Sequence, residues 1–349
     1  MTLPNLATEK MIEFLCGLLN TPSPTGMADA GIAFTEQALA AVPGISMRRT
    51  RKGALVAVIP GQRSDAPRAL TAHCDTLGGM VKEIKPNGRL KLTQIGGFAW
   101  NTVENEGCTI FTASGKTVRG SLLVNTASAH VYRMAVTETK REDANMEVRL
   151  DARTTNGDET RALGIQVGDF VAFDPRVEVV NGFVRSRHLD DKACVACVVA
   201  AVQALADAGL KPVQTTYLHI SNYEEVGHGA SAGIPDEVTE LLTVDMAAVG
   251  DGQTSNEYQT SLCVKDSGGP YHHGLSNRLR QLADEHQIPY VVDVYPFYGS
   301  DGEAFWRAGG DVAVALIGPG VDASHGYERT HTDALEATAR WVMAYLLGE

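Results

Sequence analysis

The sequence predicts an α/β fold in which a mixed sheet is covered by helices and a small all-β, barrel-like domain is inserted. Short apolar runs alternate with helical patterns in residues 1–76 and 184–349, which is typical of a sheet with helices packed on it. Residues 77–183 instead alternate apolar and polar positions between turns and contain few helical periods. A chain of 349 residues also exceeds the size at which one hydrophobic core keeps growing. We therefore expect one α/β domain built from both flanks and one inserted β domain.

The two flanks contain the elements of the expected sheet. A first helix is indicated by Met11, Leu15 and Leu18, which recur at the spacing of an amphipathic helix. Strands are expected at 54–60, 68–73, 215–221, 240–247, 289–295 and 311–318. Later helices are expected at 191–209, 272–287, 300–309 and 331–348.

The middle segment begins with a predicted hairpin. Alternating residues over 80–97 flank a Pro-Asn-Gly turn, whose Gly88 can adopt the positive φ that such a turn requires. Further short strands separated by turns are expected within 107–124, 146–154 and 168–187. This succession favours a small barrel or sandwich.

Composition and charge narrow the possible partners and compartment. Apolar residues make up 44% and charged residues 21%, as in an ordinary globular protein with an ample core. The formal net charge of −12 argues against nucleic acid or an anionic membrane as a partner. No run is long and apolar enough to span a bilayer. The six cysteines are scattered, mostly inside apolar segments, which favours a reducing, cytoplasmic location.

A histidine and an aspartate lie at the end of the expected strand 68–73. His73 and Asp75 are two residues apart, so in an extended chain they share a face while Cys74 points the other way. A metal ligand with an orienting carboxylate has this composition. Taken alone, a hydrogen-bonded polar pair at a strand end is the more common explanation of the same residues.

Two adjacent aspartates precede the most apolar of the expected helices. Asp190 and Asp191 stand where free N–H groups and the helix dipole stabilise negative charge. Capping alone needs only one of them. A bound cation explains why a second carboxylate stands beside the first.

Two adjacent glutamates follow the expected strand 215–221. Glu224 and Glu225 cannot face the same way on an extended chain, but Gly227 and Gly229 allow the chain to turn there. One carboxylate could then bind a metal while the other acts as a base on water. A solvated acidic corner is the alternative interpretation.

Three more candidates lie at the ends of expected elements. Asp245 interrupts an apolar strand, where an acid is rarely buried unless it is paired or metal-bound. His325 and His331 follow the last strand, and His331 directly precedes the last helix. All these motifs fall in the α/β flanks. In open α/β sheets, ligands bind at the carboxyl ends of the strands. Histidines and carboxylates without cysteine indicate a catalytic, zinc-type site.

In this order, the motifs resemble those of the M42 family of dinuclear metallo-aminopeptidases, and more distantly those of the M18, M20 and M28 peptidases. The motifs are Ala-His-Cys-Asp at 72–75, Leu-Asp-Asp-Lys at 189–192, Tyr-Glu-Glu-Val-Gly at 223–227, Val-Asp-Met-Ala at 244–247 and Thr-His-Thr at 330–332. The resemblance covers nearly the whole chain. It implies a hydrolase that removes N-terminal residues from small peptides and forms a homo-oligomer. A large shell is one form that such an oligomer can take.

The resemblance also implies two divalent metal ions per chain, with zinc as the first choice and cobalt or manganese as alternatives. Asp190 would bridge the two ions. His73 and Asp245 would complete one metal position, and Glu225 and His331 the other.

Two further residues are implied to take part in the reaction. Glu224 would be the general base, and Asp75 would orient His73. The residues around the last motif depart from the usual family pattern, which leaves His325 as a rival of His331.

Other functions remain compatible with the same residues. An amidohydrolase or deacylase acting on N-acyl amino acids or on a small peptide-like osmolyte would use a similar metal site. A glycosidase would pair an acid with a carboxylate and need no metal. A non-catalytic scaffold would be expected to lack one of the ligands or the base, whereas every proposed position is filled.

Overall fold

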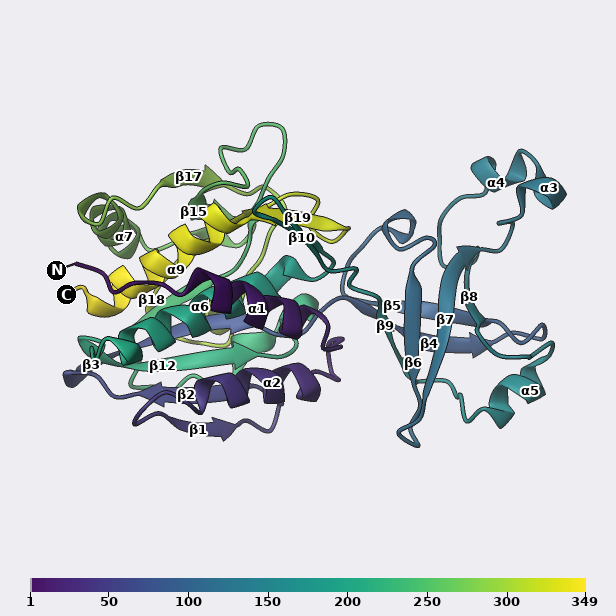
Figure 1. Ribbon diagram of the computed structural model, residues 1–349, viewed down its shortest axis with the longest axis horizontal. Helices are drawn as coiled ribbons and strands as arrows, with labels where there is room; N and C mark the ends of the chain where they lie inside the picture. Colours follow the sequence, from purple (N-terminus) through teal and green to yellow (C-terminus); the bar gives the residue numbers. More distant parts are fainter. Residues whose placement is uncertain (1) are drawn as a thin grey trace. The chain divides into compact units, whose positions relative to one another are not determined.

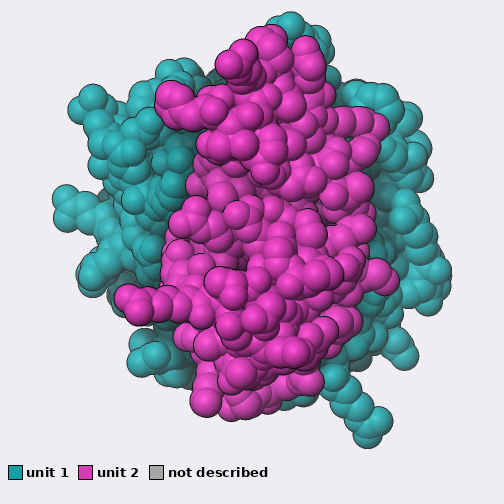
Figure 2. Space-filling model, turned by 90° about the vertical axis from the view of Figure 1, so that its right-hand side faces the viewer, with its two compact units in different colours: residues 1–75, 176–349 teal, residues 76–175 magenta. Residues whose placement is uncertain are grey.

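Two units make up the chain in the computed structural model, which describes residues 2–349. Unit 1 runs up to Asp75 and resumes at Arg176, and unit 2 comprises Thr76–Pro175; Figure 2 shows them in different colours. The sequence predicts a later end of the β domain, at residue 183. Residues 178–180 and 183–186 form two strands that pair with each other, and the second of them pairs with a strand near the C-terminus, which explains why both belong to unit 1.

A ten-stranded mixed sheet forms the centre of unit 1, in the order β1-β2-β12-β3-β13-β18-β15-β16, with β14 paired to β18 and β17 to β15 (Figure 1). The strands β3, β12, β13 and β18 are parallel neighbours, whereas β2 runs antiparallel to β12 and β15 runs antiparallel to β18. The bounds are β1 Ser46–Arg49, β2 Leu55–Ile59, β3 Arg63–His73, β12 Gln214–Ser221, β13 Glu240–Val244, β14 Ala247–Ala248, β15 Thr260–Asp266, β16 Gly269–Pro270, β17 Tyr290–Val294 and β18 Ala313–Val321.

Helices and a small second sheet complete unit 1. The helices are α1 Thr8–Leu19, α2 Asp29–Leu39, α6 Leu189–Asp207, α7 His273–Glu285, α8 Asp301–Arg307 and α9 Thr332–Leu347, with the short 3₁₀ turns η2 Glu224–Val226 and η3 Gly229–Ser231. The second sheet has the order β10-β11-β19, with bounds Glu178–Val180, Phe183–Ser186 and Glu328–His331. The expected α/β architecture is thus confirmed.

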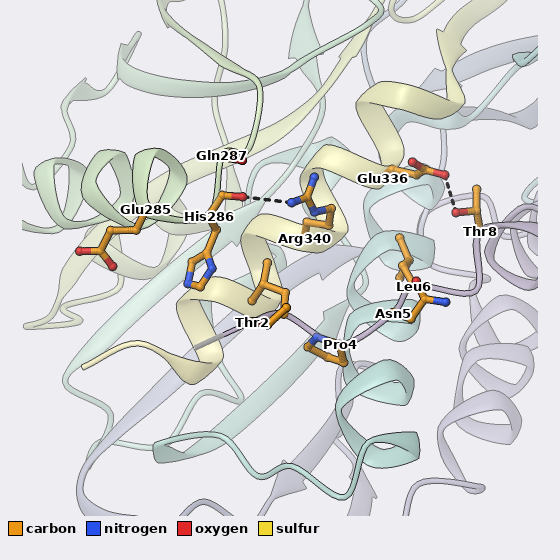
Figure 3. Close-up of a pocket in the computed structure, with 11 residues that line it drawn as sticks. Thr2, Pro4, Asn5, Leu6, Thr8, Glu285, His286, Gln287, Glu336 and Arg340 are labelled. Carbon is orange, nitrogen blue, oxygen red and sulfur yellow. Dashed lines mark hydrogen bonds between the residues drawn. The ribbon is translucent and has the colours of Figure 1, made fainter.

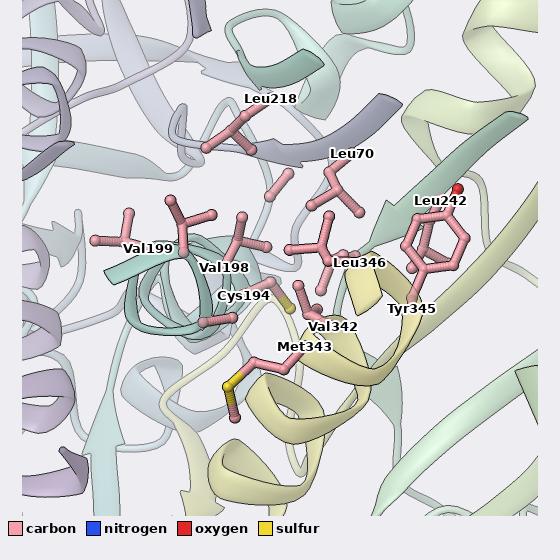
Figure 4. Packing of buried hydrophobic residues seen from close by; sticks show 14 of the residues in the cluster. Leu70, Cys194, Val198, Val199, Leu218, Leu242, Val342, Met343, Tyr345 and Leu346 are labelled. Carbon is pink, nitrogen blue, oxygen red and sulfur yellow. The ribbon is translucent and has the colours of Figure 1, made fainter. Parts of the chain in front are cut away.

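Alternate residues of the central strands pack into different hydrophobic clusters. Leu70 of β3 and Leu242 of β13 belong to a cluster that includes side chains of α6 and α9 (Figure 4). Their neighbours Ala69 and Leu241 belong to another cluster, which Phe305 of α8 contacts. Because successive side chains of a strand point to opposite faces, the sheet is buried on both faces, as is usual for parallel strands.

Unit 2 is a closed antiparallel barrel in the order β4-β5-β8-β7-β6-β9, which closes by the pairing of β9 with β4. The predicted hairpin is confirmed: Lys85 N–H donates to the carbonyl of Arg89, and Gly88 has a φ of 81°. Its elements are β4 Gly78–Ile84, β5 Leu90–Ile95, η1 Trp100–Thr102, β6 Gly107–Phe111, β7 Thr117–Val124, α3 Ala129–Tyr132, α4 Ala135–Glu138, β8 Met146–Leu150, α5 Gly157–Ala162 and β9 Phe170–Phe173.

None of the helices in residues 2–349 has the length and apolar character needed to cross a membrane.

Candidate active site

The carboxyl ends of three parallel strands bring most of the predicted site residues together. His73 is the last residue of β3, and Asp245 follows β13 directly. Glu224 and Glu225 lie in η2, a few residues after β12. Asp190 comes from the start of α6, before the regular helical conformation begins, because Asp190 and Asp191 both have non-helical backbone angles.

The first donor group consists of His73, Asp190 and Asp245, whose donor atoms lie within 4.8 Å of one another. His73 Nδ1 is 2.9 Å from the carbonyl oxygen of Asp75 and donates its proton to it. In a neutral ring the lone pair is then on Nε2, which lies 3.1 Å from Oδ1 of Asp190. A neutral imidazole held in this tautomer is the form in which histidine binds a metal.

The second donor group consists of Asp190, Glu225 and His325, also within 4.8 Å. His325 Nε2 is 3.4 Å from Oδ2 of Asp190 and 3.6 Å from Oε2 of Glu225. Asp190 thus belongs to both groups and offers one oxygen to each. A carboxylate in this position could bridge two cations.

The carboxylates of the two groups carry more negative charge than the chain balances. Among residues 2–349, the ion pairs of Asp190, Glu224 and Glu225 are formed with histidines alone. Burial, together with the charge of Asp190, raises the pKa of Glu225 to about 8 and that of Asp245 to about 7. Burial also opposes ionisation of Asp190, but hydrogen bonds from His325 and His73 outweigh it and lower the pKa of Asp190.

One buried oxygen among these carboxylates has no hydrogen-bond donor. Oε1 of Glu225 has no partner among the described residues, although burial of an unpaired acceptor is costly. Divalent cations would satisfy this oxygen and the excess charge together. The donor set, two histidines and three carboxylates, fits zinc or a similar divalent ion.

Asp75 supports the site through both its backbone and its side chain. Its carbonyl orients His73, whereas its carboxylate is 3.9 Å from the same ring. The carboxylate instead accepts hydrogen bonds from Thr25 Oγ1 at 2.7 Å and from the N–H groups of Glu224 at 3.2 Å and Glu225 at 3.4 Å. Asp75 therefore holds the backbone of the two glutamates in place.

Glu328 is a site residue that the sequence reading missed. Its Oε2 accepts from the N–H of Asp190 at 3.1 Å and its Oε1 from the N–H of His325 at 3.0 Å. One buried carboxylate thus fixes the backbone of two donors far apart in the sequence. In the sequence this residue is marked only as an acid three residues after His325, and its place at the start of β19 is known from the structure.

His331 does not join either donor group in the described structure. Its Nδ1 accepts from the N–H of Asp333 and caps α9 at 3.2 Å. Its ring packs against Phe183 and Tyr258, with centroids 4.8 and 5.4 Å away. The resemblance assigns His331 to the second group. In the structure the histidine of this group is His325, the rival that the sequence left open.

A cavity of about 400 Å³ opens onto the donor groups. Its wall includes Asp190, Glu224, Glu225, Asp245 and His325. A larger cavity of about 720 Å³ lies between the N-terminal segment, the end of α7 and α9 (Figure 3), but it contains neither donor group. We therefore take the smaller cavity as the candidate active site.

The fold and the donor set together define a class, the metal-dependent hydrolases with an α/β body. A comparison with protein-family models is more specific, because residues 53–341 match the model of the M42 glutamyl aminopeptidases. The chain therefore belongs to the M42 family and is an aminopeptidase of that family.

Individual relatives agree with this assignment. The chain is 47% identical over 341 residues to the YhfE protein of Bacillus subtilis, covering 97% of this chain and 98% of the relative. It is 24% identical over 249 residues to the lysyl aminopeptidase of Pyrococcus furiosus, covering 68% and 69%. Among solved structures, the TET1 peptidase of Pyrococcus horikoshii has the same fold, with a TM-score of 0.83 and 19% identity, covering 97% of this chain and 100% of that one.

Proposed function

We propose that this aminopeptidase removes N-terminal residues from small peptides with two divalent metal ions, zinc in the first place and cobalt or manganese as alternatives. Asp190 would bridge them, with His73 and Asp245 at one ion and Glu225 and His325 at the other. The observation that carries the proposal is that two donor groups share one aspartate, which offers a different oxygen to each. Bound there, the ions would acidify water and polarise the scissile carbonyl.

Glu224 is the general base in this proposal. Its carboxylate lines the cavity and lies 3.6 Å from His73 Nε2, but it belongs to neither donor group. Burial raises its pKa, so it holds a proton well once it has taken one from water. The same carboxyl group can then protonate the leaving amine.

Asp75 and Glu328 are positioning residues. Asp75 holds the N–H groups of Glu224 and Glu225, so that the base and the ligand point in different directions from a short 3₁₀ turn. Glu328 holds the backbone of Asp190 and His325. Neither carboxylate is itself required as a metal donor.

We extend the proposal to assembly and location on different grounds. The Pyrococcus horikoshii TET1 peptidase can assemble into a tetrahedron or a large octahedral shell, and a homo-oligomer is the corresponding proposal for this chain. Light scattering measures the mass of the particle. All six cysteines are free, which supports a reducing compartment such as the cytoplasm.

Replacing the two glutamates separately tests the reaction. Glu224→Gln preserves shape but cannot accept the proton, so it should keep both ions and lose about 10²–10⁴-fold in kcat. Glu225→Gln removes a charged ligand, so it should lose one ion and regain part of its activity when metal is added. Metal content and hydrolysis of an aminoacyl p-nitroanilide are measured on both variants.

The controls separate the proposal from its rivals. An N-acetylated form of the same substrate should not be cleaved by an aminopeptidase, whereas a deacylase would accept it. If excess metal rescues Glu224→Gln rather than Glu225→Gln, the roles of the two glutamates are exchanged. If neither variant changes metal content or rate, the proposed site is refuted.

A further inference from the structure

The candidate active-site cavity is also lined by residues outside both donor groups. The loop between β17 and α8 contributes Phe297, Tyr298 and Ser300 to its wall, and α8 contributes Glu303 and Arg307. None of these residues belongs to a donor group. This second wall can therefore contact the parts of a substrate that do not bind metal.

The hydroxyl groups of the second wall are already engaged within the protein. Tyr298 donates its hydroxyl proton to the carbonyl of Met246 at 2.7 Å. Ser300 Oγ lies 2.7 Å from the hydroxyl of Tyr271. Neither hydroxyl depends on a substrate for a hydrogen-bond partner.

The charged groups of the second wall offset each other. Glu303 and Arg307 are one helical turn apart, and Glu303 Oε2 accepts from Arg307 Nη2 at 2.6 Å. An acidic substrate side chain that approached Arg307 would also meet Glu303, and a cationic one that approached Glu303 would also meet Arg307. This pair therefore gives a charged side chain little advantage over an apolar one.

Phe297 provides the apolar surface of the second wall. It is 96% exposed, the most exposed of the large apolar residues in the range 2–349, and none of the other exposed ones lines this cavity. Two more apolar residues, Met246 and Ala248, line the same cavity. Single exposed apolar residues are common on protein surfaces, but a ring at the mouth of a binding cavity can be covered by the ligand.

The backbone on both sides of Phe297 is fixed by one serine. Ser267 Oγ donates to the carbonyl of Pro296 at 3.1 Å and accepts from the N–H of Tyr298 at 3.0 Å. The N–H of Ser267 also donates to the carbonyl of Tyr298 at 3.1 Å. Because this backbone is already ordered, covering the ring requires little further loss of conformational entropy.

We propose that Phe297 is a specificity-determining residue whose ring packs against an apolar side chain of one of the two substrate residues that flank the scissile bond. This inference rests on the proposed aminopeptidase function and specifies its substrate class, peptides with a large apolar residue at that bond. Removing the side chain and the ring from water together favours binding in proportion to the apolar area that they cover.

Shortening Phe297 tests the inference by a change at the protein surface. The selectivity is the ratio of kcat/KM for leucyl p-nitroanilide to that for alanyl p-nitroanilide. Phe297→Ala should lower this ratio about fivefold to tenfold, because the larger substrate loses the ring that it contacts. Phe297→Leu keeps an apolar side chain and should retain most of the ratio. Val294→Ala is the matched control, since Val294 is exposed nearby in the chain but does not line the cavity.

Dipeptides identify which substrate side chain contacts the ring. The values of kcat/KM for leucyl-alanine and alanyl-leucine are each divided by the value for alanyl-alanine. A lower quotient for leucyl-alanine in Phe297→Ala assigns the contact to the first residue, and a lower quotient for alanyl-leucine assigns it to the second. Unchanged selectivity for both dipeptides and for the p-nitroanilides would refute the inference.

Two other outcomes would overturn it. One is a wild-type preference for glutamyl or lysyl p-nitroanilide over the leucyl compound. The other is a smaller particle in light scattering of Phe297→Ala with unchanged selectivity, which would make the ring a contact between subunits.

Calorimetry with free leucine and alanine provides a test that does not depend on turnover. Wild-type protein should bind leucine about tenfold more tightly than alanine, and Phe297→Ala should bind the two about equally. Equal binding of both amino acids by the wild type would contradict the inference. If the wild type cleaves no peptide, the proposed function fails, while leucine binding still decides the role of Phe297.

Discussion

Glu147 in unit 2 and Glu225 in unit 1 are both buried, but the chain neutralises only the first of them. The side chain of Glu147 is 3% exposed and pairs with Lys85 and with Arg89, the latter at 2.5 Å. The side chain of Glu225 is 4% exposed, lies 3.6 Å from one histidine and keeps one oxygen unpaired. Burial of an acid is therefore no sign of function by itself. A buried acid that has neither a lysine or arginine partner nor hydrogen-bond donors for both of its oxygens is instead a candidate for binding a cation.

The same difference extends to other carboxylates of the two units. In the barrel, Glu104 accepts two hydrogen bonds from Arg141 and Asp174 two from Arg119. In unit 1, Asp190 has histidines as its charged partners. The barrel thus balances these charges within itself, whereas the donor groups of unit 1 would be balanced by the divalent cations that we propose.

Asp190→Ala should have the largest effect, because this residue contributes to both donor groups. We expect loss of both metal ions and of about 10³-fold or more in activity, since neither position keeps its shared ligand. Elemental analysis after gel filtration measures the ions. Two ions per chain retained in this variant would show that Asp190 is not a bridge.

His219 sharpens the comparison, because the chain keeps this buried group of unit 1 uncharged. Burial, reinforced by the positive charges of Lys52 and Arg48, lowers the pKa of His219 to about 4. The unfolded chain, with an ordinary histidine pKa, then binds more protons between about pH 4 and 6.5. The contribution of neutral His219 to the free energy of unfolding is therefore fully present above about pH 6.5. It is lost as the pH falls through about 4, and amounts to about 3 kcal/mol in all.

His219→Gln should flatten this part of the pH dependence. Urea unfolding of both proteins at pH 7 and pH 4.5 measures it. The control variant is His130→Gln, which replaces an exposed histidine of α3. Its stability should depend on pH in the same way as that of the wild type. An equal slope in wild type and His219→Gln would contradict the assignment.

Glu147→Gln tests the other side of the comparison. It leaves Lys85 and Arg89 without their carboxylate, so unfolding of the protein should become easier by about 2 kcal/mol. Metal content and activity should not change. The more exposed pair of Glu142 with Lys140 provides the control, because Glu142→Gln should cost less than about 0.5 kcal/mol. A loss of metal in Glu147→Gln would break the distinction between the two units.

The smallest difference we predict separates two histidines. His325→Ala should weaken binding of one metal ion at least about tenfold, because it removes a donor of the second group. His331→Ala should keep metal affinity and instead cost about 1 kcal/mol of stability, because it removes the cap of α9. Metal titration against a chelator compares the two variants. Weakened binding in His331→Ala alone would restore the sequence-based choice.

The fold was largely predictable, because its strands and helices follow local patterns. The run that ends at His73 and the apolar helix after Asp191 both occur where the sequence places them. The second domain boundary was not predictable, because β10 and β11 alternate like barrel strands. Only the pairing of β11 with β19, more than a hundred residues later, assigns the two strands to unit 1.

The candidate site was predictable where its residues stand at the ends of regular elements. His73, Asp190, Glu225 and Asp245 are of this kind. His325 lies in an irregular loop with a φ of 62°, and no periodicity indicates where such a loop directs a side chain. Glu328 was missed for a related reason, since its partners are backbone N–H groups, which carry no sequence signal.

The loop that carries His325 is closed at its base, where Asp322 and Arg329 exchange backbone hydrogen bonds of 2.8 and 3.1 Å. Glu328, next to this base, holds the N–H of His325. The span in between is a loop with two fixed ends that carries the proposed metal ligand His325. Ser324 lies in that span and lines the cavity. Substitutions at this one position could therefore change the size of the cavity while both ends of the loop stay in place. New substrate pockets could be built on this scaffold at that position without redesigning the sheet beneath it.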